Sequence, residues 1–332
     1  MSGRVHLSVA EARALGEAAC RGLGYDAGEA RIITDHVIDA ALCGYEYSGL
    51  AKILNLPEHP RFKLPRRPVS VLRETDISTL FDGGNNVGML ALHRAADAAI
   101  TKALRAGVAL IGVTNSWVSG RSAYYVERIA RAGLVALHTA SSSRMVAPLG
   151  GLRPILGTNP IAFALPAAHD VVVFDMGTSA FMMTELMLRE RLGQELPEGV
   201  AIDRAGNPTR DPAEARRGAL LPFGGHKGYG LALMVQALGV VAGSALDVDR
   251  DNGYLFIAFK PDLLRPLDEF KREMTELIER VKATPRPPGA PEIRIPSENA
   301  FRHRAKALRD GLDIDASVYE ALQRLGGSAR QT

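Results

Sequence analysis

The spacing of apolar residues predicts helices at both ends of the chain and alternating helices and strands between them. Ser8 and Glu11 have the spacing of a capping box, and the apolar positions that follow recur at helical intervals as far as Leu23. A second amphipathic helix is predicted from about Glu29 to Cys43. Further helices are predicted over residues 88–106, 122–132, 227–242, 268–281, 299–312 and 316–325, and strands over 108–113, 134–138, 161–165, 171–174 and 254–258. The pattern indicates a layered α/β region with helical segments on either side of it.

Length and composition are those of an ordinary globular protein. The chain has 332 residues, of which 46% are hydrophobic and 23% are charged, so a buried core is expected and two domains are favoured. The 40 lysine and arginine residues outnumber the 37 acidic residues by only three, and the arginines are spread along the chain. A nucleic-acid partner is therefore not expected.

Neither a disulfide framework nor a membrane segment is predicted. Cys20 and Cys43 are the two cysteines, and both lie in apolar helical patterns where buried free thiols are common. Charged residues interrupt the N-terminal stretch, and no run reaches the roughly 18 apolar residues that a membrane helix needs. We expect a cytoplasmic protein in a reducing compartment, without membrane association.

The common cofactor and metal signatures do not occur in the sequence. No G-x-G-x-x-G follows a predicted strand, and no G-x-x-x-x-G-K-[ST] is present, so neither a Rossmann fold nor a P-loop is supported. The eight histidines are scattered without metal-binding spacing, and no cysteine lies near one to complete a site. No metal is predicted, and each histidine taken singly is better explained as structural.

Two turns next to predicted strands are candidates for ligand binding. Residues 156–163 place small and amide side chains in a turn immediately before a strand, where backbone N–H groups often meet ligands. Residues 174–179 carry Asp175 at a strand end, followed by hydroxyl groups where a helix could begin. Such a start favours an anion. A tight loop and an ordinary N-cap explain the two segments equally well.

A third segment, residues 222–231, is the most informative stretch of the chain. Four glycines surround His226 and Lys227 at the N-terminus of a predicted helix, which combines close backbone approach with N–H donors and positive charge. A lysine so near the positive end of a helix is otherwise unfavourable. The segment therefore favours a phosphate-bearing ligand.

In these segments the sequence resembles the malate/L-lactate dehydrogenase superfamily. Its members are unrelated to the Rossmann dehydrogenases and include ureidoglycolate, sulfolactate and diketogulonate oxidoreductases and piperideine/pyrroline-2-carboxylate reductases. The similarity covers nearly the whole chain. Its markers are Gly150-Gly151, Leu156-Gly157-Thr158-Asn159-Pro160, Phe174-Asp175-Met176, Leu196-Pro197-Glu198-Gly199, Pro208-Thr209-Arg210-Asp211-Pro212 and Pro222-Phe223-Gly224-Gly225-His226-Lys227-Gly228. Several ordered motifs with matching spacing make the resemblance specific.

The resemblance implies a homodimeric α/β enzyme that binds NAD or NADP and a small carboxylate substrate. It implies a non-Rossmann, three-layer NAD(P)-binding domain over residues 111–289, inserted between the N- and C-terminal helical segments. Those segments, residues 1–110 and 290–332, would form a second, discontinuous domain for substrate binding and dimerisation. The substrate would lie between the two domains.

The same resemblance, residue by residue, implies a set of binding and catalytic groups. The cofactor-binding residues would be Ser119, Gly120, Asp175, Met176, Gly177, Thr178, Ser179, His226, Lys227, Ser297, Glu298 and Asn299. The substrate-binding residues would be Lys52, Val118, Ser142, Thr158 and Asn159, with Lys52 holding the substrate carboxylate. The catalytic residues would be Tyr47 and Ser48 beside the substrate and Asp211 as an orienting carboxylate. For Asp211 a local helix cap is an equally good explanation.

The sequence departs from the family where the chemistry needs a proton. Ser48 and Val118 stand where family members have histidines, and Lys52 replaces an arginine. Lysine keeps the positive charge but loses the bidentate fork. Reduction of a ketone builds negative charge on oxygen, and a positioned proton donor accelerates such a step about 10²–10⁴-fold. Valine cannot donate a proton, and serine is a poor acid.

Three hypotheses for the function remain open. In the first, hydride transfer persists and the substrate is a cyclic or N-substituted 2-imino acid, which can arrive already protonated. In the second, the substrate is a 2-oxo or 2-hydroxy acid and the acid is Tyr47, Tyr124, Tyr125, His226 or a water held by Ser48. In the third, the chain binds the cofactor without hydride transfer, as a sensor, a partner or a non-redox enzyme. Because the predicted cofactor segments are intact, an oxidoreductase that prefers imino acids is favoured.

Overall fold

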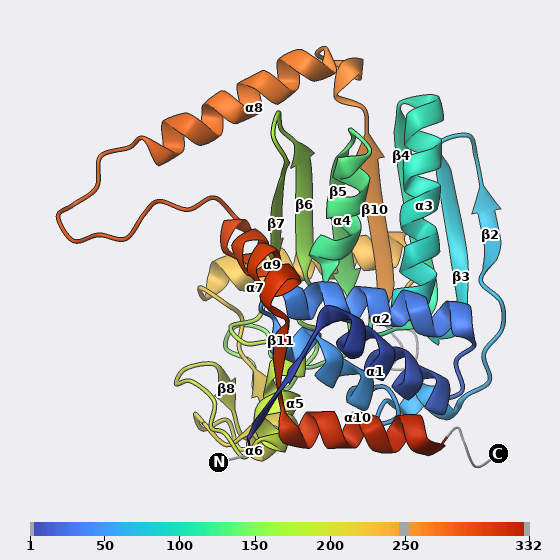
Figure 1. Cartoon of the computed structure of the whole chain (residues 1–332), viewed down its shortest axis with the longest axis vertical. Coiled ribbons are helices and arrows are strands. Elements are labelled where there is room, and N and C mark those ends of the chain that lie inside the picture. Colours follow the sequence, from blue (N-terminus) through green and yellow to red (C-terminus); the bar gives the residue numbers. More distant parts are fainter. Residues whose placement is uncertain (1–2, 246–251, 329–332) are drawn as a thin grey trace.

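A computed structural model describes residues 3–245 and 252–328, and its centre is a seven-stranded mixed sheet (Figure 1). The strand order is β2-β3-β4-β10-β5-β6-β7. The strands are β2 (Ser70–Glu74), β3 (Ser78–Val87), β4 (Val108–Trp117), β5 (Val135–Ser141), β6 (Ile161–Pro166), β7 (Val171–Met176) and β10 (Gly253–Phe259). Strands β3 and β4 pair in parallel, and the other neighbours in this sheet are antiparallel.

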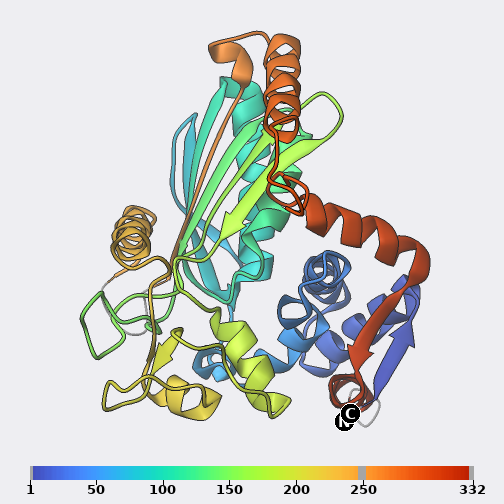
Figure 2. The same ribbon diagram turned by 90° about the vertical axis from the view of Figure 1, so that its left-hand side faces the viewer.

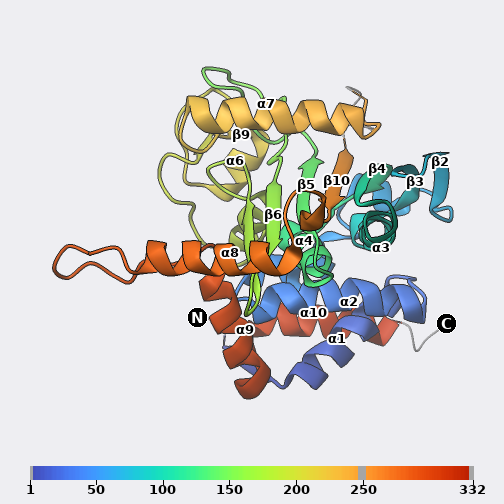
Figure 3. The same cartoon turned by 90° about the horizontal axis from the view of Figure 1, so that it is seen from above.

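Helices cover both faces of this sheet (Figure 3). Helices α3 (Gly88–Ala106) and α4 (Ser122–Arg131) lie on one face, and α7 (His226–Val241) lies on the other. A run of alanines at helical spacing, Ala91, Ala95 and Ala99, lets α3 approach the sheet closely and is completely buried. On the other face Gly239 allows α7 to approach the sheet closely, because a Cβ atom there would lie 2.1 Å from the Ser141 hydroxyl. The sheet therefore lies between two helical layers.

The two ends of the chain pack together below the sheet (Figure 1). Helices α1 (Val9–Gly22) and α2 (Ala27–Leu42) each begin with a capping box, formed by Ser8 with Glu11 and by Asp26 with Glu29. At the other end α9 (Glu298–Asp310), β11 (Leu312–Asp315) and α10 (Ala316–Ser328) follow one another, and β11 pairs with β1 (Arg4–Leu7). Gly22 has no room for a Cβ atom, which would lie 1.8 Å from the Leu325 carbonyl oxygen, so α1 and α10 are in close contact.

Part of the long segment between β7 and β10 forms a smaller lobe beside the N-terminal helices (Figure 2). It contains α5 (Met183–Arg191), β8 (Ala201–Ile202), α6 (Pro212–Arg217) and β9 (Ala219–Leu220), and it leads into α7 on the face of the sheet. A separate apolar cluster that includes Leu186 and Leu196 forms its core. After β10 and a short turn, η4 (Pro261–Leu263), helix α8 (Leu267–Lys282) projects away from the molecule with no buried residue.

The sequence-based elements agree with the structure in the helices better than in the strands. The predicted strand 108–113 continues to Trp117, and the helix predicted over 299–312 ends at Asp310 because Leu312 begins strand β11. Strands β1, β2, β3 and β11 were not predicted. The domain boundary predicted at residue 110 falls inside β4, and the sheet also takes in β2 and β3 from the N-terminal segment.

Candidate active site

Two cavities that share a wall lie between the N-terminal turns and the sheet. We call them the small cavity, of about 160 Å³, and the large cavity, of about 500 Å³. Their walls come from the turns η1 (Glu46–Ser48) and η2 (Leu50–Asn55), from the chain just after β4 and β7, and from the start of α5. The residues common to both are Lys52, Gly120, Pro160, Met182 and Thr184. A third cavity, of about 480 Å³, shares Ser142 and Arg144 with the large one.

Lys52 is the charged group at the junction of the two cavities. Its side chain is only 5% exposed, and Nζ donates a hydrogen bond to Ser48 Oγ at 3.2 Å. Burial lowers the pKa of Lys52 to about 8, and the negative charge of Asp175 acts in the opposite direction. Within the described residues its ammonium group forms no salt bridge. A buried ammonium that faces a cavity without an ion-pair partner is suited to bind an anion such as a carboxylate.

Asp175 places a carboxyl group, which is partly buried, at the small cavity. It lies at the end of β7, and its Oδ2 accepts a hydrogen bond of 2.8 Å from the Ala123 N–H in the first turn of α4. Burial raises the pKa of this carboxyl group, while the Ala123 N–H, Arg121 and Lys52 lower it. The interaction fixes β7 against α4 and brings Met176 and Gly177 into the wall of the small cavity.

Tyr47 and Ser48 enter the small cavity from η1, as two hydroxyl groups on the side of Lys52. The only donor that the described structure directs at the Ser48 hydroxyl is the Lys52 ammonium. Burial raises the pKa of the Tyr47 phenol, and the charge of Glu185 adds to that effect. Both side chains can therefore position a substrate by neutral hydrogen bonds at ordinary pH.

Val118 occupies a strained position in the wall of the large cavity. Its φ angle is 53°, in the left-handed region that β-branched residues rarely adopt. Asn115, three residues earlier, has the same φ, but asparagine tolerates this conformation. The chain then continues through Ser119 and Gly120, which also line the large cavity. Strain of this kind persists only where the surroundings impose it, and it is common at functional sites.

Thr158 and Asn159 have different environments although they are adjacent. Thr158 lines the large cavity together with Ser142. Asn159 is completely buried, and its amide links three segments: Oδ1 accepts from the Ser142 N–H at 3.1 Å, and Nδ2 donates to Ala232 O and Gln236 Oε1 at 3.0 Å. Asn159 therefore connects the turn to α7, while Thr158 lines the cavity.

Several predicted site residues lie outside the walls of these cavities. Thr178 and Ser179 are buried and bond to backbone oxygens, Thr178 to Thr158 O and Ser179 to Phe181 O. His226 and Lys227 are exposed at the start of α7, although Tyr229, in the next part of that helix, lines the third cavity.

Of the three predicted cofactor residues in the C-terminal turn, one lies in a cavity wall and two do not. Ser297 lines the small cavity, whereas Glu298 accepts hydrogen bonds from Arg302 at 2.8 Å and from the Ile295 N–H at 3.0 Å. Asn299 does not appear in the walls of the three cavities either. Asp211 caps α6 by accepting from the Ala213 and Glu214 N–H groups, which is the local cap considered above.

Two of the proposed alternative acids also lie elsewhere. The Tyr125 ring is completely buried, and its hydroxyl donates to Ser119 O at 2.6 Å. Tyr124 packs on His36, with ring centroids 4.6 Å apart, and does not line the cavities described here.

The large cavity also contains residues that sequence reasoning missed. They are polar or flexible side chains from segments far apart in the chain: Asn55, Glu58, His59, Arg144, Met183, Met187, Arg216, Asn252 and Tyr254. No sequence motif marks them, because each reaches the cavity through turns whose paths are set by tertiary packing. The methionines at the start of α5 are the exception, since a cluster of Met in a chain with nine could have indicated an adaptable binding surface.

Some polar atoms in the walls of the two cavities are buried without a partner in the described structure. Ser122 belongs to the wall of the small cavity and Asn252 to that of the large one, and Ser122 Oγ and Asn252 Oδ1 are the buried atoms. Buried polar atoms nearly always form hydrogen bonds, so these two are suited to meet a bound molecule. Arg144 and Arg216 bring positive charge to the large cavity. Together these groups could hold the amide, hydroxyl and phosphate groups of a dinucleotide.

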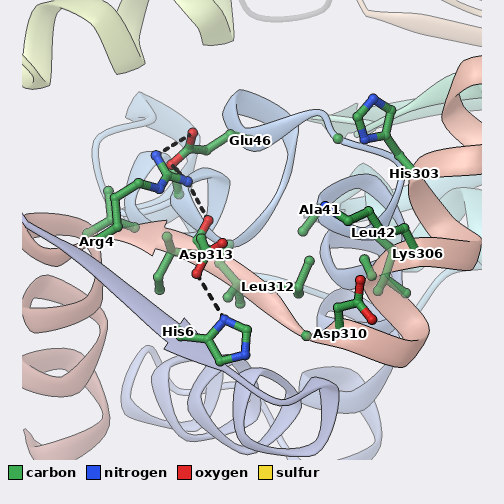
Figure 4. A pocket seen from close by; sticks show the side chains of 17 residues that line it. Arg4, His6, Ala41, Leu42, Glu46, His303, Lys306, Asp310, Leu312 and Asp313 are labelled. Carbon is green, nitrogen blue, oxygen red and sulfur yellow. Dashed lines mark hydrogen bonds and ion pairs between the residues drawn. The ribbon is translucent and has the colours of Figure 1, made fainter.

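A further cavity, of about 310 Å³, lies on another side of the molecule between β1, β11 and α9 (Figure 4). Four of its polar side chains form two pairs, Arg4 with Glu46 and His6 with Asp313. Within the described residues there is no group of three or more His, Cys, Asp or Glu side chains that could hold a metal ion. None of the helices in the described ranges is long and apolar enough to cross a membrane.

Comparison with known proteins gives matches over most of the chain. The family model described as Malate/L-lactate dehydrogenase matches residues 7–323. The Malate/(S)-sulfolactate dehydrogenase of Methanothermus fervidus is 30% identical over 332 residues, covering 96% of each chain. The Delta(1)-pyrroline-2-carboxylate/Delta(1)-piperideine-2-carboxylate reductase of Pseudomonas putida is 36% identical over 260 residues, or 74% of each chain. The solved sulfolactate dehydrogenase of Methanocaldococcus jannaschii superposes with a TM-score of 0.86 at 30% identity, covering 98% of each chain.

Proposed function

Because the chain belongs to the malate/L-lactate dehydrogenase family, we propose that it is an NAD- or NADP-dependent oxidoreductase of small 2-substituted acids. The observation that carries the proposal is Lys52, a buried ammonium at the junction of two cavities whose walls include predicted cofactor residues. The substrates would be 2-oxo or 2-hydroxy acids or cyclic 2-imino acids. The names of the relatives, which include both a sulfolactate dehydrogenase and a pyrroline/piperideine carboxylate reductase, support this range.

The structure offers a chemically suitable environment for the dinucleotide. The Ser122 hydroxyl can donate or accept a hydrogen bond and the Asn252 amide oxygen can accept one. Arg144 and Arg216, the latter also paired with Glu190 at 3.2 Å, can meet phosphate oxygens. When bound, the cofactor supplies a hydride to the substrate carbon. The residues Ser119, Gly120, Asp175, Met176, Gly177 and Ser297 would contact it in the two cavities. His226 and Lys227, at the exposed start of α7, would contribute from the side of the third cavity.

The substrate would lie with its carboxylate at Lys52. Ser48 holds the Lys52 ammonium, and Tyr47 can donate from the same wall. We further propose the two-domain organisation in which residues 111–289 carry the cofactor and the N- and C-terminal segments carry the substrate groups. Its support is that Tyr47, Ser48 and Lys52 belong to the N-terminal segment, whereas Gly120 and Asp175 belong to the central one.

Among these substrates we propose that cyclic imino acids are preferred. An imine nitrogen can be protonated in water before it binds, so hydride addition gives a neutral amine without an enzymic acid. A ketone needs stabilisation of the oxygen on which charge develops. Neither Ser48 nor Val118 supplies the acid that a histidine would. The second candidate, a cofactor-binding protein without hydride transfer, is favoured by the same two replacements.

Binding and turnover together separate these candidates. We expect NADH or NADPH fluorescence to change on binding at micromolar to millimolar concentration, and Δ1-piperideine-2-carboxylate to be reduced faster than pyruvate or oxaloacetate. No cofactor binding at millimolar concentration would exclude both candidates. Binding without turnover of any of these acids would favour the second.

Restoring one family histidine tests whether the site is a ketone reductase that lost its acid. The variant Val118→His is expected to raise the turnover of pyruvate or oxaloacetate at least tenfold, because the imidazole can donate a proton there. Histidine also tolerates a positive φ better than valine, so the variant should fold normally. Steady-state kinetics measures the gain, with Val118→Asn as the control that relieves strain without adding an acid. An unchanged rate of oxo-acid reduction in Val118→His would indicate that the site has been remodelled and no longer uses an acid at position 118.

We also propose that the protein is a homodimer, with α7 in the interface. This helix carries exposed apolar side chains along its outer face, Leu233, Met234, Val240 and Val241, the last of them 73% exposed. A contiguous apolar stripe on the surface is unusual for a monomer. Light scattering should give a mass of twice the 35.6 kDa of one chain, and the mass of a single chain would contradict the proposal.

A further inference from the structure

A histidine that the family pattern does not mark lies in the wall of the large cavity. His59 follows η2 and precedes the turn η3 (Pro60–Lys63), and it lines the same cavity as Lys52 and Val118. Ten residues of chain separate it from Ser48, so it is not a displaced copy of either missing histidine. The path of the chain through η2 and η3 nevertheless brings an imidazole to the cavity from which both family histidines are absent.

The ring of His59 is held in one orientation. It stacks on the Trp117 indole with ring centroids 4.6 Å apart and an angle of 14° between planes. Trp117 is itself fixed, because it is 1% exposed and its Nε1 donates to Asn85 O at 3.0 Å. Since Val118 follows Trp117 directly, the stack anchors the imidazole next to the position of the second family histidine.

The hydrogen bonding of His59 also determines which nitrogen carries the proton. Nδ1 accepts a hydrogen bond of 3.2 Å from the Arg61 N–H, so its lone pair is occupied. Burial, with the charge of Arg61 as a smaller contribution, lowers the pKa of His59 to about 4. The ring is therefore neutral at pH 7, and its single proton resides on Nε2. Among the described residues Nε2 forms no hydrogen bond, which leaves this N–H group available to a molecule in the cavity.

We propose that the Nε2–H group of His59 donates a hydrogen bond to the carbonyl oxygen of a 2-oxo acid whose carboxylate is bound at Lys52. The inference rests on the proposed function and identifies the group that makes oxo acids substrates despite Ser48 and Val118. A neutral imidazole is a suitable donor, because a fixed, neutral N–H group can stabilise the oxygen on which negative charge develops.

The reaction balances with one hydride and one proton. The hydride forms a C–H bond at C2, and the π electron pair of the carbonyl group moves to oxygen. The Nε2–H group stabilises that oxygen by its hydrogen bond, and the oxygen takes its proton from solvent water, so the imidazole stays neutral throughout. A protonated cyclic imine follows a different course, because hydride addition neutralises its charge and leaves nothing for His59 to stabilise. The two substrate types should therefore depend on His59 to different degrees.

Two substitutions in the full-length chain test this assignment. His59→Phe keeps a ring to stack on Trp117 but removes the donor, and His59→Gln places an amide N–H close to the position of Nε2. With NADH or NADPH and pyruvate or oxaloacetate, kcat of His59→Phe should fall about 10²–10³-fold, as for loss of one oxyanion donor. His59→Gln should recover at least tenfold of that loss. Reduction of Δ1-piperideine-2-carboxylate should change less than threefold in both variants.

The controls separate catalysis from folding and from the proposed function. Both variants should keep the thermal midpoint and the cofactor affinity of the wild type. His303→Gln, in the separate cavity of Figure 4, should leave both substrates unaffected. An unchanged oxo-acid rate in His59→Phe, or an equal loss for oxo and imino acids, would overturn the role of His59. So would a wild type that reduces the imine but none of the oxo acids, and this last result would leave the proposed function intact. Cofactor binding without any turnover would overturn the proposed function itself.

Discussion

Exchanging Lys52 for methionine is expected to raise KM for the acid substrate about 10–150-fold, which corresponds to the loss of a hydrogen bond to a charged group worth about 1.5–3 kcal/mol. The ammonium is buried, faces both cavities and is held by Ser48 Oγ. Methionine fills a similar volume without the charge, so the cavity should keep its shape. The affinity for the cofactor should change little, because Lys52 is proposed to bind the carboxylate of the substrate.

The same residue predicts how substrate binding depends on pH. Because burial lowers the pKa of Lys52 to about 8, the ammonium form that binds a carboxylate is present below that pH and is lost above it. KM should therefore be constant to about pH 8 and rise about tenfold for each further pH unit. Steady-state kinetics between pH 6.5 and 9.5 measures this, and Lys52→Met should abolish the dependence.

Lys102 provides the matched control for Lys52. It is also mostly buried, but its ammonium pairs with Glu74 at 2.9 Å on the far edge of the sheet. Lys102→Met should leave KM and its pH profile unchanged. A Lys52→Met enzyme with wild-type KM would show that another group holds the substrate carboxylate.

Replacing Asp39 by asparagine is expected to lower the free energy of unfolding by about 3 kcal/mol. Asp39 lies on α2 between two arginines, with Arg121 Nη1 at 2.8 Å and Arg304 Nη2 at 2.9 Å from its carboxylate oxygens. Arg304 also pairs with Glu127 of α4 at 2.6 Å. The substitution leaves two largely buried guanidinium groups short of one negative charge. Loss of a partner in a buried network is costly because the remaining charges stay desolvated.

This network also joins the segments that form the site. It connects α2, the chain before α4, α4 itself and α9, so Asp39→Asn should loosen the wall that carries Gly120 and Arg121. Urea unfolding measures the effect. Glu17→Gln, which removes the exposed partner of Arg21 on α1, is the control and should give no measurable shift. Equal stability of Asp39→Asn and wild type would show that the network contributes specificity rather than stability.

Elements with strong local patterns could be predicted from the sequence. The capping box of Ser8 and Glu11 defines the start of α1, and the alanine stripe of α3 follows the helical period. Strand β3 was missed because its second half is Asp82-Gly83-Gly84-Asn85-Asn86, which reads as a turn. In the structure this stretch is buried against β4 and the chain around Arg67, whose carbonyl accepts from Asn86 Nδ2 at 2.7 Å. Such strands are specified by tertiary contacts rather than by local propensity.

The candidate site could be predicted only in part, because sequence motifs mark some of its residues and tertiary contacts alone bring in the others. Motif matches identified Lys52, Ser48 and Asp175, which the structure places at one cavity. They could not show that Asp211 caps α6, because an N-cap and an orienting carboxylate have the same sequence signature. They also could not show that His59 enters the large cavity, since that depends on the stack with Trp117.

Transfer of deuterium tests the central claim most directly. Wild-type protein is incubated with Δ1-piperideine-2-carboxylate and NADH or NADPH that carries deuterium at both C4 positions, and the product is analysed by mass spectrometry and NMR. Hydride transfer predicts one deuterium per product molecule, located at C2, with one cofactor oxidised for each product formed. Cofactor that binds but is not oxidised, or product without deuterium at C2, would contradict the account.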